Sequence, residues 1–171
     1  MVEQILQQIE KRSLGNFFLI AGPCVVESEE ICHHIAETLQ VLCKNLDIPY
    51  IFKASYRKAN RSKLDSYTGM GDLPGLEILR EIRETYQLPV LTDIHTDEEA
   101  AIAAQYVDVL QIPAFLCRQT SLLVAAAETG KTVNIKKGQF MSPEGMSFAV
   151  EKLRQSGNQQ DWQTDSGTRF R

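Results

Sequence analysis

The side chains with the clearest chemical potential are cations gathered in one short stretch. Residues 52 to 63, FKASYRKANRSK, carry five of them: Lys53, Arg57, Lys58, Arg61 and Lys63. An arginine can hold a phosphate through two parallel hydrogen bonds, whereas a lysine acts as a compact charge that can also donate a proton. The stretch can therefore be a solvated loop, a nucleic-acid patch or a site for phosphorylated molecules.

The overall charge narrows this choice. The chain has 18 Lys plus Arg against 22 Asp plus Glu, a formal net charge of -4, which argues against a nucleic-acid binder or a protein of acidic membranes. Apolar runs such as FFLIAG are far shorter than the roughly 20 residues that span a bilayer, and the amino terminus lacks a signal pattern. We expect a cytoplasmic protein whose basic cluster acts locally.

Other chemically capable residues follow apolar runs. Asp93 and His95 stand two apart in LTDIH, and Gln111 ends the run in LQIPAFLCRQT. In NIKKGQF, strand alternation would send Lys136 and Lys137 in opposite directions, and a buried ammonium needs an anion or a carboxylate. We expect Lys136 to face inward, toward a bound anion or in a salt bridge with Asp93.

The four cysteines form no CxxC pair, so a zinc knuckle or a disulfide framework is not expected. Cys32, Cys43 and Cys117 are expected to be buried thiols. Cys24 follows a Gly-Pro turn and is either a packed thiol or a functional group at the same rim as the other polar residues.

An alternation of strands and helices must position these side chains. The expected strands are residues 17–22, 49–55, 89–94, 107–114 and 132–137, and the expected helices are 28–46, 73–86, 96–106, 119–130 and 142–157. This order indicates a parallel α/β fold, and polar residues at the carboxyl ends of strands favour a (β/α)8 barrel over a doubly wound sheet. A barrel typically needs roughly 250 residues. We therefore expect residues 1–171 to be one partial barrel domain with five to six β/α units.

Five segments together carry a family resemblance: GPCVVES, FKASYRKANRS, LTDIH, LQIPAFLCRQT and NIKKGQF. In this order the chain resembles the Kdo-8-phosphate synthase family, whose members form TIM barrels, usually homotetramers. The resemblance implies condensation of phosphoenolpyruvate with arabinose 5-phosphate in the biosynthesis of the Kdo sugar of lipopolysaccharide. KANRS separates the chain from the related 3-deoxy-heptulosonate 7-phosphate synthases, which typically carry a KPRTS-like segment.

The resemblance also implies roles for individual residues. The implied phosphoenolpyruvate ligands are Lys53, Lys58, Gln111 and Lys136. The implied ligands of arabinose 5-phosphate are Asn60, Arg61, Ser62 and, reaching an adjacent subunit's site, Arg118. Lys58 and Asp93 are the implied catalytic residues, and Cys24 is the implied ligand of a divalent metal, iron or zinc, whose other family ligands lie on later strands.

The carboxyl end departs from this pattern. DWQTD lacks the apolar run of a barrel strand, and TDSGTRFR places Ser166 where the family has an arginine that binds the phosphate of phosphoenolpyruvate. Residues 161–171 are thus expected to be a divergent tail, and the 171-residue chain is expected to have little synthase activity alone. The alternatives are a noncatalytic remnant or oligomerisation partner of a full-length synthase, and a heptulosonate synthase.

Overall fold

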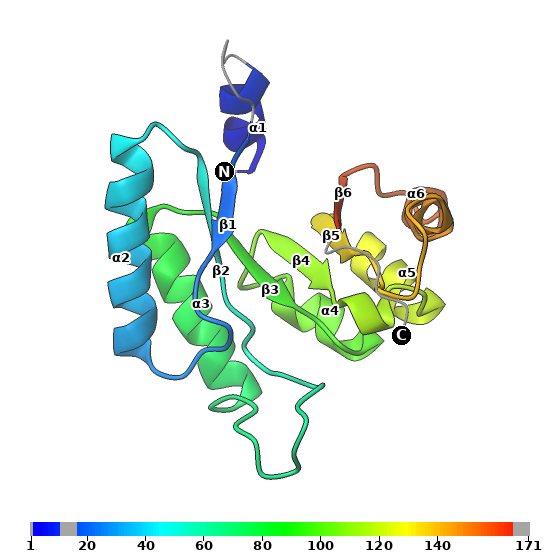
Figure 1. The fold of residues 1–171 in the computed structure, drawn as a ribbon, viewed down its shortest axis with the longest axis horizontal. Coiled ribbons are helices and arrows are strands. Elements are labelled where there is room, and N and C mark those ends of the chain that lie inside the picture. Colours follow the sequence, from blue (N-terminus) through cyan, green and yellow to red (C-terminus); the bar gives the residue numbers. More distant parts are fainter. Residues whose placement is uncertain (1, 11–16, 166–171) are drawn as a thin grey trace. The chain divides into compact units, whose positions relative to one another are not determined.

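The computed structural model describes residues 2–10 and 17–165. In these residues six short strands alternate with helices, in agreement with the predicted α/β class (Figure 1). The chain divides into two compact units, the first formed by Met1–Thr92 with Tyr106–Asp108 and the second by Asp93–Gln105 with Val109–Arg171. None of the described helices is both long and apolar enough to cross a bilayer.

The first unit contains three parallel strands and three helices. Its elements are α1 (Val2–Glu10), β1 (Leu19–Ala21), α2 (Glu29–Asn45), β2 (Tyr50–Lys53), α3 (Asp72–Tyr86) and β3 (Val90–Asp93), whose last residue is grouped with the second unit. Strand β2 lies between β1 and β3, with Leu19 opposite Tyr50 and Phe52 opposite Val90. Helices α2 and α3 lie side by side (Figure 1).

The sequence accounts for these elements locally. Helix α2 begins after Ser28, whose hydroxyl accepts a hydrogen bond from the Ile31 backbone N–H at 3.2 Å and so caps the helix. Its buried residues Cys32, Ala36 and Cys43 recur at helical spacing and form the face turned to the interior. The first three residues of β2 are buried, as expected for a central parallel strand.

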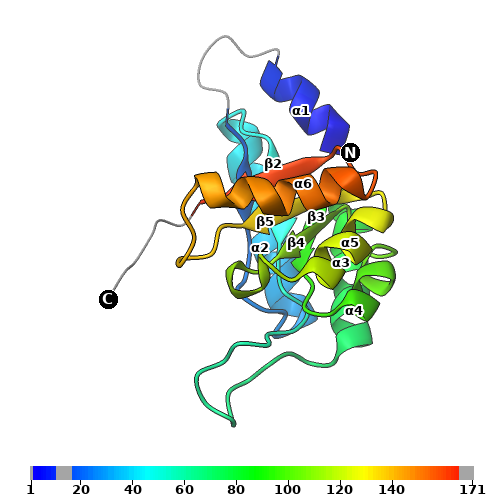
Figure 2. The ribbon, with the colours of Figure 1, turned by 90° about the vertical axis from the view of Figure 1, so that its right-hand side faces the viewer.

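The second unit repeats the same alternation. Its elements are α4 (Asp97–Ala103), β4 (Val109–Ile112), α5 (Thr120–Glu128), β5 (Thr132–Lys136), α6 (Ser147–Gln155) and β6 (Asp161–Thr164), with short 3-10 turns at Ala114–Leu116 and Glu144–Met146. Strand β5 pairs in parallel with β4 and with β6. Helix α5 packs beside both α4 and α6 (Figure 2).

Strand β6 gives the chain a sixth strand, the upper number of the predicted five to six units, although no strand was assigned to DWQTD. Asp161–Thr164 pairs with β5, with Asn134 opposite Trp162 and the Lys137 N–H donating to the Thr164 carbonyl at 2.8 Å. Arg154 also holds Asp161 through a 3.0 Å ion pair. Backbone pairing satisfies the strand, and its residues are half-buried or exposed, so no apolar run is needed. Ser166 and the rest of the expected tail lie outside the described residues.

Helix α1 is a second element that the strand and helix pattern did not predict. The other predicted elements are present, with ends that differ by a few residues. The described residues supply six strands rather than the eight of a closed barrel, so the complete (β/α)8 form stays a prediction.

Candidate functional site

The first unit brings two predicted lysines to one hydroxyl group. The ammonium groups of Lys53 and Lys58 donate to the Ser55 hydroxyl oxygen at 3.0 Å and 2.7 Å. Both lysines are half-buried, and Ser55 is fully buried. We call these three residues the lysine–serine cluster. It is a concentrated positive site of the kind that binds phosphate or carboxylate groups.

Backbone contacts fix this cluster. Strand β2 ends at Lys53, and Ser55 then forms a bridge with Val25, while its carbonyl accepts the Val26 N–H at 2.9 Å. Gly22 approaches the same strand end so closely that a Cβ atom at residue 22 would overlap the Lys53 carbonyl. The turn after β1 and the end of β2 are therefore packed backbone against backbone.

The loop after the cluster presents the predicted sugar-phosphate ligands. Asn60, Arg61 and Ser62 are all exposed. Arg61 Nε donates to the Tyr67 carbonyl at 3.0 Å, and a hollow of about 450 Å³ is lined by Glu27, Arg61, Ser66 and Tyr67. The backbone bond holds Arg61 at the hollow while most of its guanidinium group stays available for an anion.

The other cations of this loop behave differently. Arg57 forms a 3.1 Å ion pair with Asp72, and Lys63 is exposed. Lys63 therefore faces solvent. Arg57 is instead used to tie the loop to the start of α3.

The second unit contains a chain of hydrogen-bonded polar side chains, three of them buried and the fourth half-buried. Gln111 Nε2 donates to Asp93 Oδ1 at 2.6 Å, Asn134 Nδ2 donates to Gln111 Oε1 at 2.8 Å, and the Thr164 hydroxyl donates to Asn134 Oδ1 at 3.0 Å. We call these four residues the polar chain. The exposed fractions of Asp93, Gln111 and Asn134 are 5%, 6% and 1%. Sequence reasoning identified Asp93 and Gln111 but missed Asn134 and Thr164.

His95 contacts Glu99, at the start of α4. Its backbone N–H donates to Glu99 Oε2 at 2.8 Å, and its ring Nδ1 lies 3.3 Å from the same oxygen. Strand β3 ends at Asp93, so the alternation that would keep Asp93 and His95 on one face does not extend to His95. Glu99 is a further buried carboxylate that sequence reasoning did not single out.

The buried lysine of NIKKGQF is Lys137 rather than Lys136. Lys137 is 3% exposed, and its ammonium group donates to the carbonyls of Met141 and Gly138 at 3.2 Å and 3.3 Å and pairs with Asp165 at 3.4 Å. The expectation that a buried ammonium finds a carboxylate is thus confirmed, for the neighbouring residue. Lys136 is half-buried at the end of β5, and its role as a ligand stays a prediction.

The remaining predicted residues are a cation and the cysteines. Arg118 is exposed, just before α5. Cys32, Cys43 and Cys117 are buried, as predicted, and Cys24 is exposed. Burial, and then the charge of Glu27, raises the pKa of the Cys32 thiol to about 11. Cys32 is therefore an inert core thiol, whereas Cys24 is accessible to a ligand.

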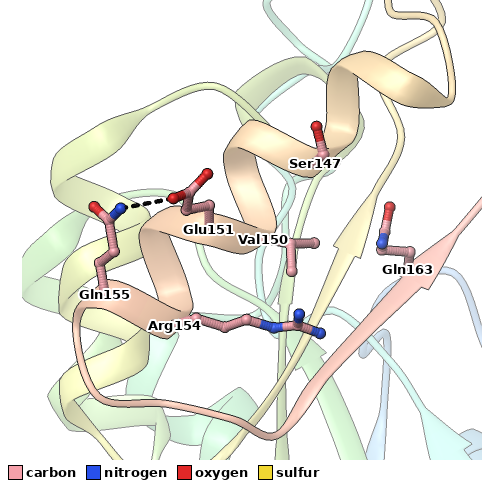
Figure 3. A pocket seen from close by; sticks show the side chains of 6 residues that line it. All are labelled: Ser147, Val150, Glu151, Arg154, Gln155 and Gln163. Atoms are coloured by element: carbon pink, nitrogen blue, oxygen red, sulfur yellow. Dashed lines mark hydrogen bonds between the residues drawn. The ribbon is translucent and has the colours of Figure 1, made fainter.

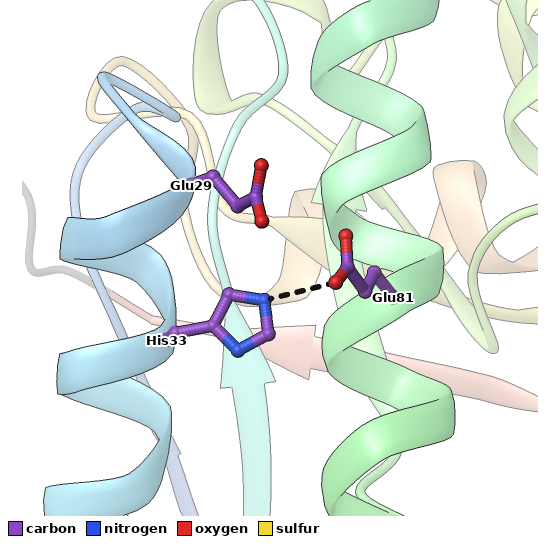
Figure 4. A group of neighbouring side chains, drawn as sticks. All are labelled: Glu29, His33 and Glu81. Carbon is purple, nitrogen blue, oxygen red and sulfur yellow. Dashed lines mark ion pairs between the residues drawn. The ribbon is translucent and has the colours of Figure 1, made fainter.

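The predicted metal centre has one candidate ligand here. Within residues 2–10 and 17–165, Cys24 joins no group of three potential ligands; the group that does occur is Glu29, His33 and Glu81, with ligand atoms within 4.8 Å of one another (Figure 4). His33 Nε2 lies 3.6 Å from Glu81. Both glutamates are exposed, and the contact is explained as a pairing between α2 and α3. The described residues thus do not complete a metal centre around Cys24.

A second hollow is lined by residues other than the predicted ligands. It has a volume of about 620 Å³ and is lined by residues of α6 and β6 (Figure 3): Ser147, Val150, Glu151, Arg154, Gln155 and Gln163. Glu151 accepts a hydrogen bond from Gln155, and Arg154 pairs with Asp161. None of the predicted ligands lines it, so the candidate functional groups are the lysine–serine cluster and the Arg61 hollow in the first unit and, separately, the polar chain in the second.

The predicted ligands are thus distributed over both units. The structure brings Lys53 together with Lys58, and Asp93 together with Gln111. Asn60, Arg61 and Ser62 follow the lysines in the first unit, whereas Arg118 and Lys136 belong to the second.

A family model and several curated proteins match most of this chain. The model of the DAHP synthetase I family matches residues 6–171. A protein of Koribacter versatilis named 2-dehydro-3-deoxyphosphooctonate aldolase is 58% identical over 153 residues, which cover 90% of this chain and 55% of that relative. Proteins of the same name from a Cyanothece species and from Fusobacterium nucleatum are 52% and 46% identical, over 90% and 97% of this chain and 56% and 63% of theirs. The chain spans about half the length of the curated relatives it matches.

Proposed function

The chain belongs to the DAHP synthetase I family, and on that premise we propose that it serves the condensation of phosphoenolpyruvate with D-arabinose 5-phosphate. The products are 3-deoxy-D-manno-octulosonate 8-phosphate and inorganic phosphate, the former a precursor of the Kdo sugar of lipopolysaccharide. The names of the relatives support this choice within the family. The segment KANRS, at residues 58–62, favours the arabinose 5-phosphate acceptor over erythrose 4-phosphate.

The observation that carries the proposal is the lysine–serine cluster. Phosphoenolpyruvate has a carboxylate and a phosphate, and two ammonium groups held at 3.0 Å and 2.7 Å from one oxygen suit such a polyanion. In the proposed assignment Lys53 and Lys58 bind it together with Gln111 and Lys136. Neutralising its charge lowers the cost of bringing a second phosphorylated molecule close.

The reaction forms one carbon–carbon bond and releases one phosphate. C3 of phosphoenolpyruvate attacks the aldehyde carbon of the sugar, whose oxygen takes up a proton and becomes a hydroxyl. The oxygen of a water molecule adds at C2, and the bond between C2 and the phosphate oxygen breaks, which leaves the ketone. In this scheme Lys58 stabilises the departing phosphate and can give it a proton, while Asp93 accepts protons near the reacting carbons.

The acceptor's phosphate is assigned to the exposed loop of the first unit. Arg61 lines a hollow and can give two parallel hydrogen bonds to a phosphate, and Asn60 and Ser62 add neutral donors beside it. Arg118 is proposed to reach the sugar phosphate in the site of an adjacent subunit, which requires an oligomer, a tetramer in the family.

The remaining parts of the proposal concern the metal and the cell compartment. Cys24 is exposed after β1, and we propose it as one thiolate ligand of iron or zinc. A bound divalent ion would supply a Lewis acid that orients the reactants. The remaining ligands are not supplied by the described residues, so no step is assigned to the ion. The substrates are small cytoplasmic metabolites, which favours a cytoplasmic location.

Binding and turnover test the proposal separately. Isothermal titration of the 171-residue chain with phosphoenolpyruvate is expected to give saturable binding, and phosphate release with both substrates and added Fe²⁺ or Zn²⁺ is expected to be slow. Arabinose 5-phosphate should be preferred over erythrose 4-phosphate. Absence of phosphoenolpyruvate binding would contradict the proposed function. If the chain bound a full-length synthase but showed no turnover itself, the alternative of a noncatalytic partner would be favoured.

A further inference from the structure

The polar chain of the second unit has a defined direction. Three of its four members donate a hydrogen bond in the direction of Asp93: the Thr164 hydroxyl to Asn134, the Asn134 amide to Gln111, and the Gln111 amide to the Asp93 carboxylate. The donors come from three successive strands, β6, β5 and β4. Asp93 terminates the series on β3, which is the position of a pure acceptor.

This direction follows from the chemistry of the four groups. An ionised carboxylate only accepts hydrogen bonds, so Gln111 must turn its NH₂ group toward Asp93 and its carbonyl oxygen away. That oxygen needs a donor, which Asn134 supplies, and Asn134 in turn presents its own oxygen to the Thr164 hydroxyl. Because Asn134 is 1% exposed, water cannot readily replace either partner.

This orientation of the Gln111 amide leaves one N–H of its NH₂ group for a ligand. Its NH₂ group has two hydrogens, and the bond to Asp93 uses one of them. The second points away from the carboxylate and can donate to an oxygen of an anionic ligand. In the opposite orientation of the amide, a carbonyl oxygen would face both Asp93 and the ligand and would repel both.

We infer that Asn134 and Thr164 are positioning residues that hold Gln111 in the one amide orientation able to donate to Asp93 and to bound phosphoenolpyruvate. This inference rests on the proposed function, since Gln111 is there a ligand of phosphoenolpyruvate. Neither Asn134 nor Thr164 touches the substrate in this scheme. Thr164 belongs to the strand that sequence reasoning missed, which is why its role was missed as well.

Three variants of the 171-residue chain test the inference by calorimetric titration with phosphoenolpyruvate. Thr164→Val keeps the shape of the side chain and removes the donor, and is expected to weaken binding about 3- to 10-fold. Thr164→Ser restores the hydroxyl and should bind within about twofold of the wild type. Asn134→Asp turns an acceptor toward Gln111, forces the amide to rotate, and should weaken binding more than about 10-fold.

The control is Thr132→Val. Thr132 is another threonine of this sheet, buried on β5, and its hydroxyl donates to Gln160 at 3.2 Å, outside the polar chain. This variant should lose stability without losing affinity, and thermal unfolding monitored by circular dichroism verifies that each variant folds. Equal affinity losses in Thr132→Val and Thr164→Val, or no rescue by Thr164→Ser, would overturn the inference.

A second measurement is independent of substrate. In ¹⁵N NMR spectra without ligand, the side-chain NH₂ signals of Gln111, identified by Gln111→Glu, should shift in Thr164→Val and Asn134→Asp but not in Thr132→Val. If the wild type fails to bind phosphoenolpyruvate, the proposed function fails, and these signals still decide whether Asn134 and Thr164 orient Gln111. Unchanged Gln111 signals in both Thr164→Val and Asn134→Asp would refute the inference that these residues orient the Gln111 amide.

Discussion

Replacement of Lys58 by methionine separates an anion site from an ordinary solvated loop. The two ammonium nitrogens of the lysine–serine cluster both lie at one hydroxyl oxygen, so they are within about 6 Å of each other. Lys58→Met keeps most of the side-chain volume and removes one of these charges. Affinity for phosphoenolpyruvate should fall, while stability should not.

The magnitudes follow from Coulomb's law. Two unit charges about 6 Å apart repel by about 3 kcal/mol at an effective dielectric constant of about 20 and by about 0.7 kcal/mol in water. Both lysines are half-buried, so the repulsion relieved by the variant lies between these values and offsets the lost bond to Ser55. In Lys58→Met, a phosphate oxygen that lay about 4 Å from the ammonium group loses an attraction of about 1 to 4 kcal/mol. A middle value of about 2 kcal/mol corresponds to a roughly 30-fold loss of affinity.

Calorimetric titration at low and at high salt measures the affinity, and thermal unfolding measures stability. The matched control is Lys63→Met, in the same loop but exposed, which should change affinity by less than about twofold. The ratio between the two variants should shrink as salt screens the site. Equal affinity in the wild type and Lys58→Met, or equal losses in Lys58→Met and Lys63→Met, would refute the assignment of the cluster.

Three further changes probe other parts of the molecule. Arg61→Ala should weaken arabinose 5-phosphate at least about 10-fold more than phosphoenolpyruvate in titrations, because the guanidinium group is assigned to the sugar phosphate; equal losses would contradict that assignment. Cys24→Asn should lower the iron or zinc content measured by elemental analysis, and undiminished metal would end its role as a ligand. Because burial raises the pKa of Cys32 to about 11, its contribution to stability is complete below pH 9 and is lost as the pH rises toward 11; the unfolding free energy should fall by about 2 to 3 kcal/mol over this range in denaturant titrations, and Cys32→Ala should show a smaller fall.

Much of the fold follows from the sequence because it depends on local patterns. Five strands and their helices were predicted from apolar runs and capping residues, as at Ser28 for α2. Strand β6 was not, since Asp161–Thr164 is held by backbone pairing and an ion pair, which leave no periodic apolar signal. The helix α1 likewise lay outside the strand and helix alternation.

The candidate site was predictable to the extent that single residues carry charge. Lys53, Lys58 and Gln111 were identified, but Ser55, Asn134 and Thr164 were not. Ser55 matters because both lysines turn to its hydroxyl group, whereas Asn134 and Thr164 matter because of the side chains near them on neighbouring strands. The register of the strands determines which side chains meet across the sheet, and the identity of a single residue does not reveal the register. Lys136 lies two residues after Asn134 on β5 and so shares its strand face, whereas the deeper burial of Lys137 was not predicted, because β5 ends at Lys136 and Lys137 turns to nearby carbonyls.

The backbone contact between Gly22 and Lys53 has a consequence for the mutational tolerance of the protein. Any side chain at residue 22 would have to displace the backbone carbonyl of Lys53 at the end of β2. The ammonium group of Lys53 would move with its backbone. In a saturation library selected for phosphoenolpyruvate binding, position 22 should therefore be as depleted of substitutions as position 53. Gly22, which has no functional group, would then tolerate as few substitutions as a ligand residue. Related proteins that differ in this turn are expected to differ in its length and to keep the glycine.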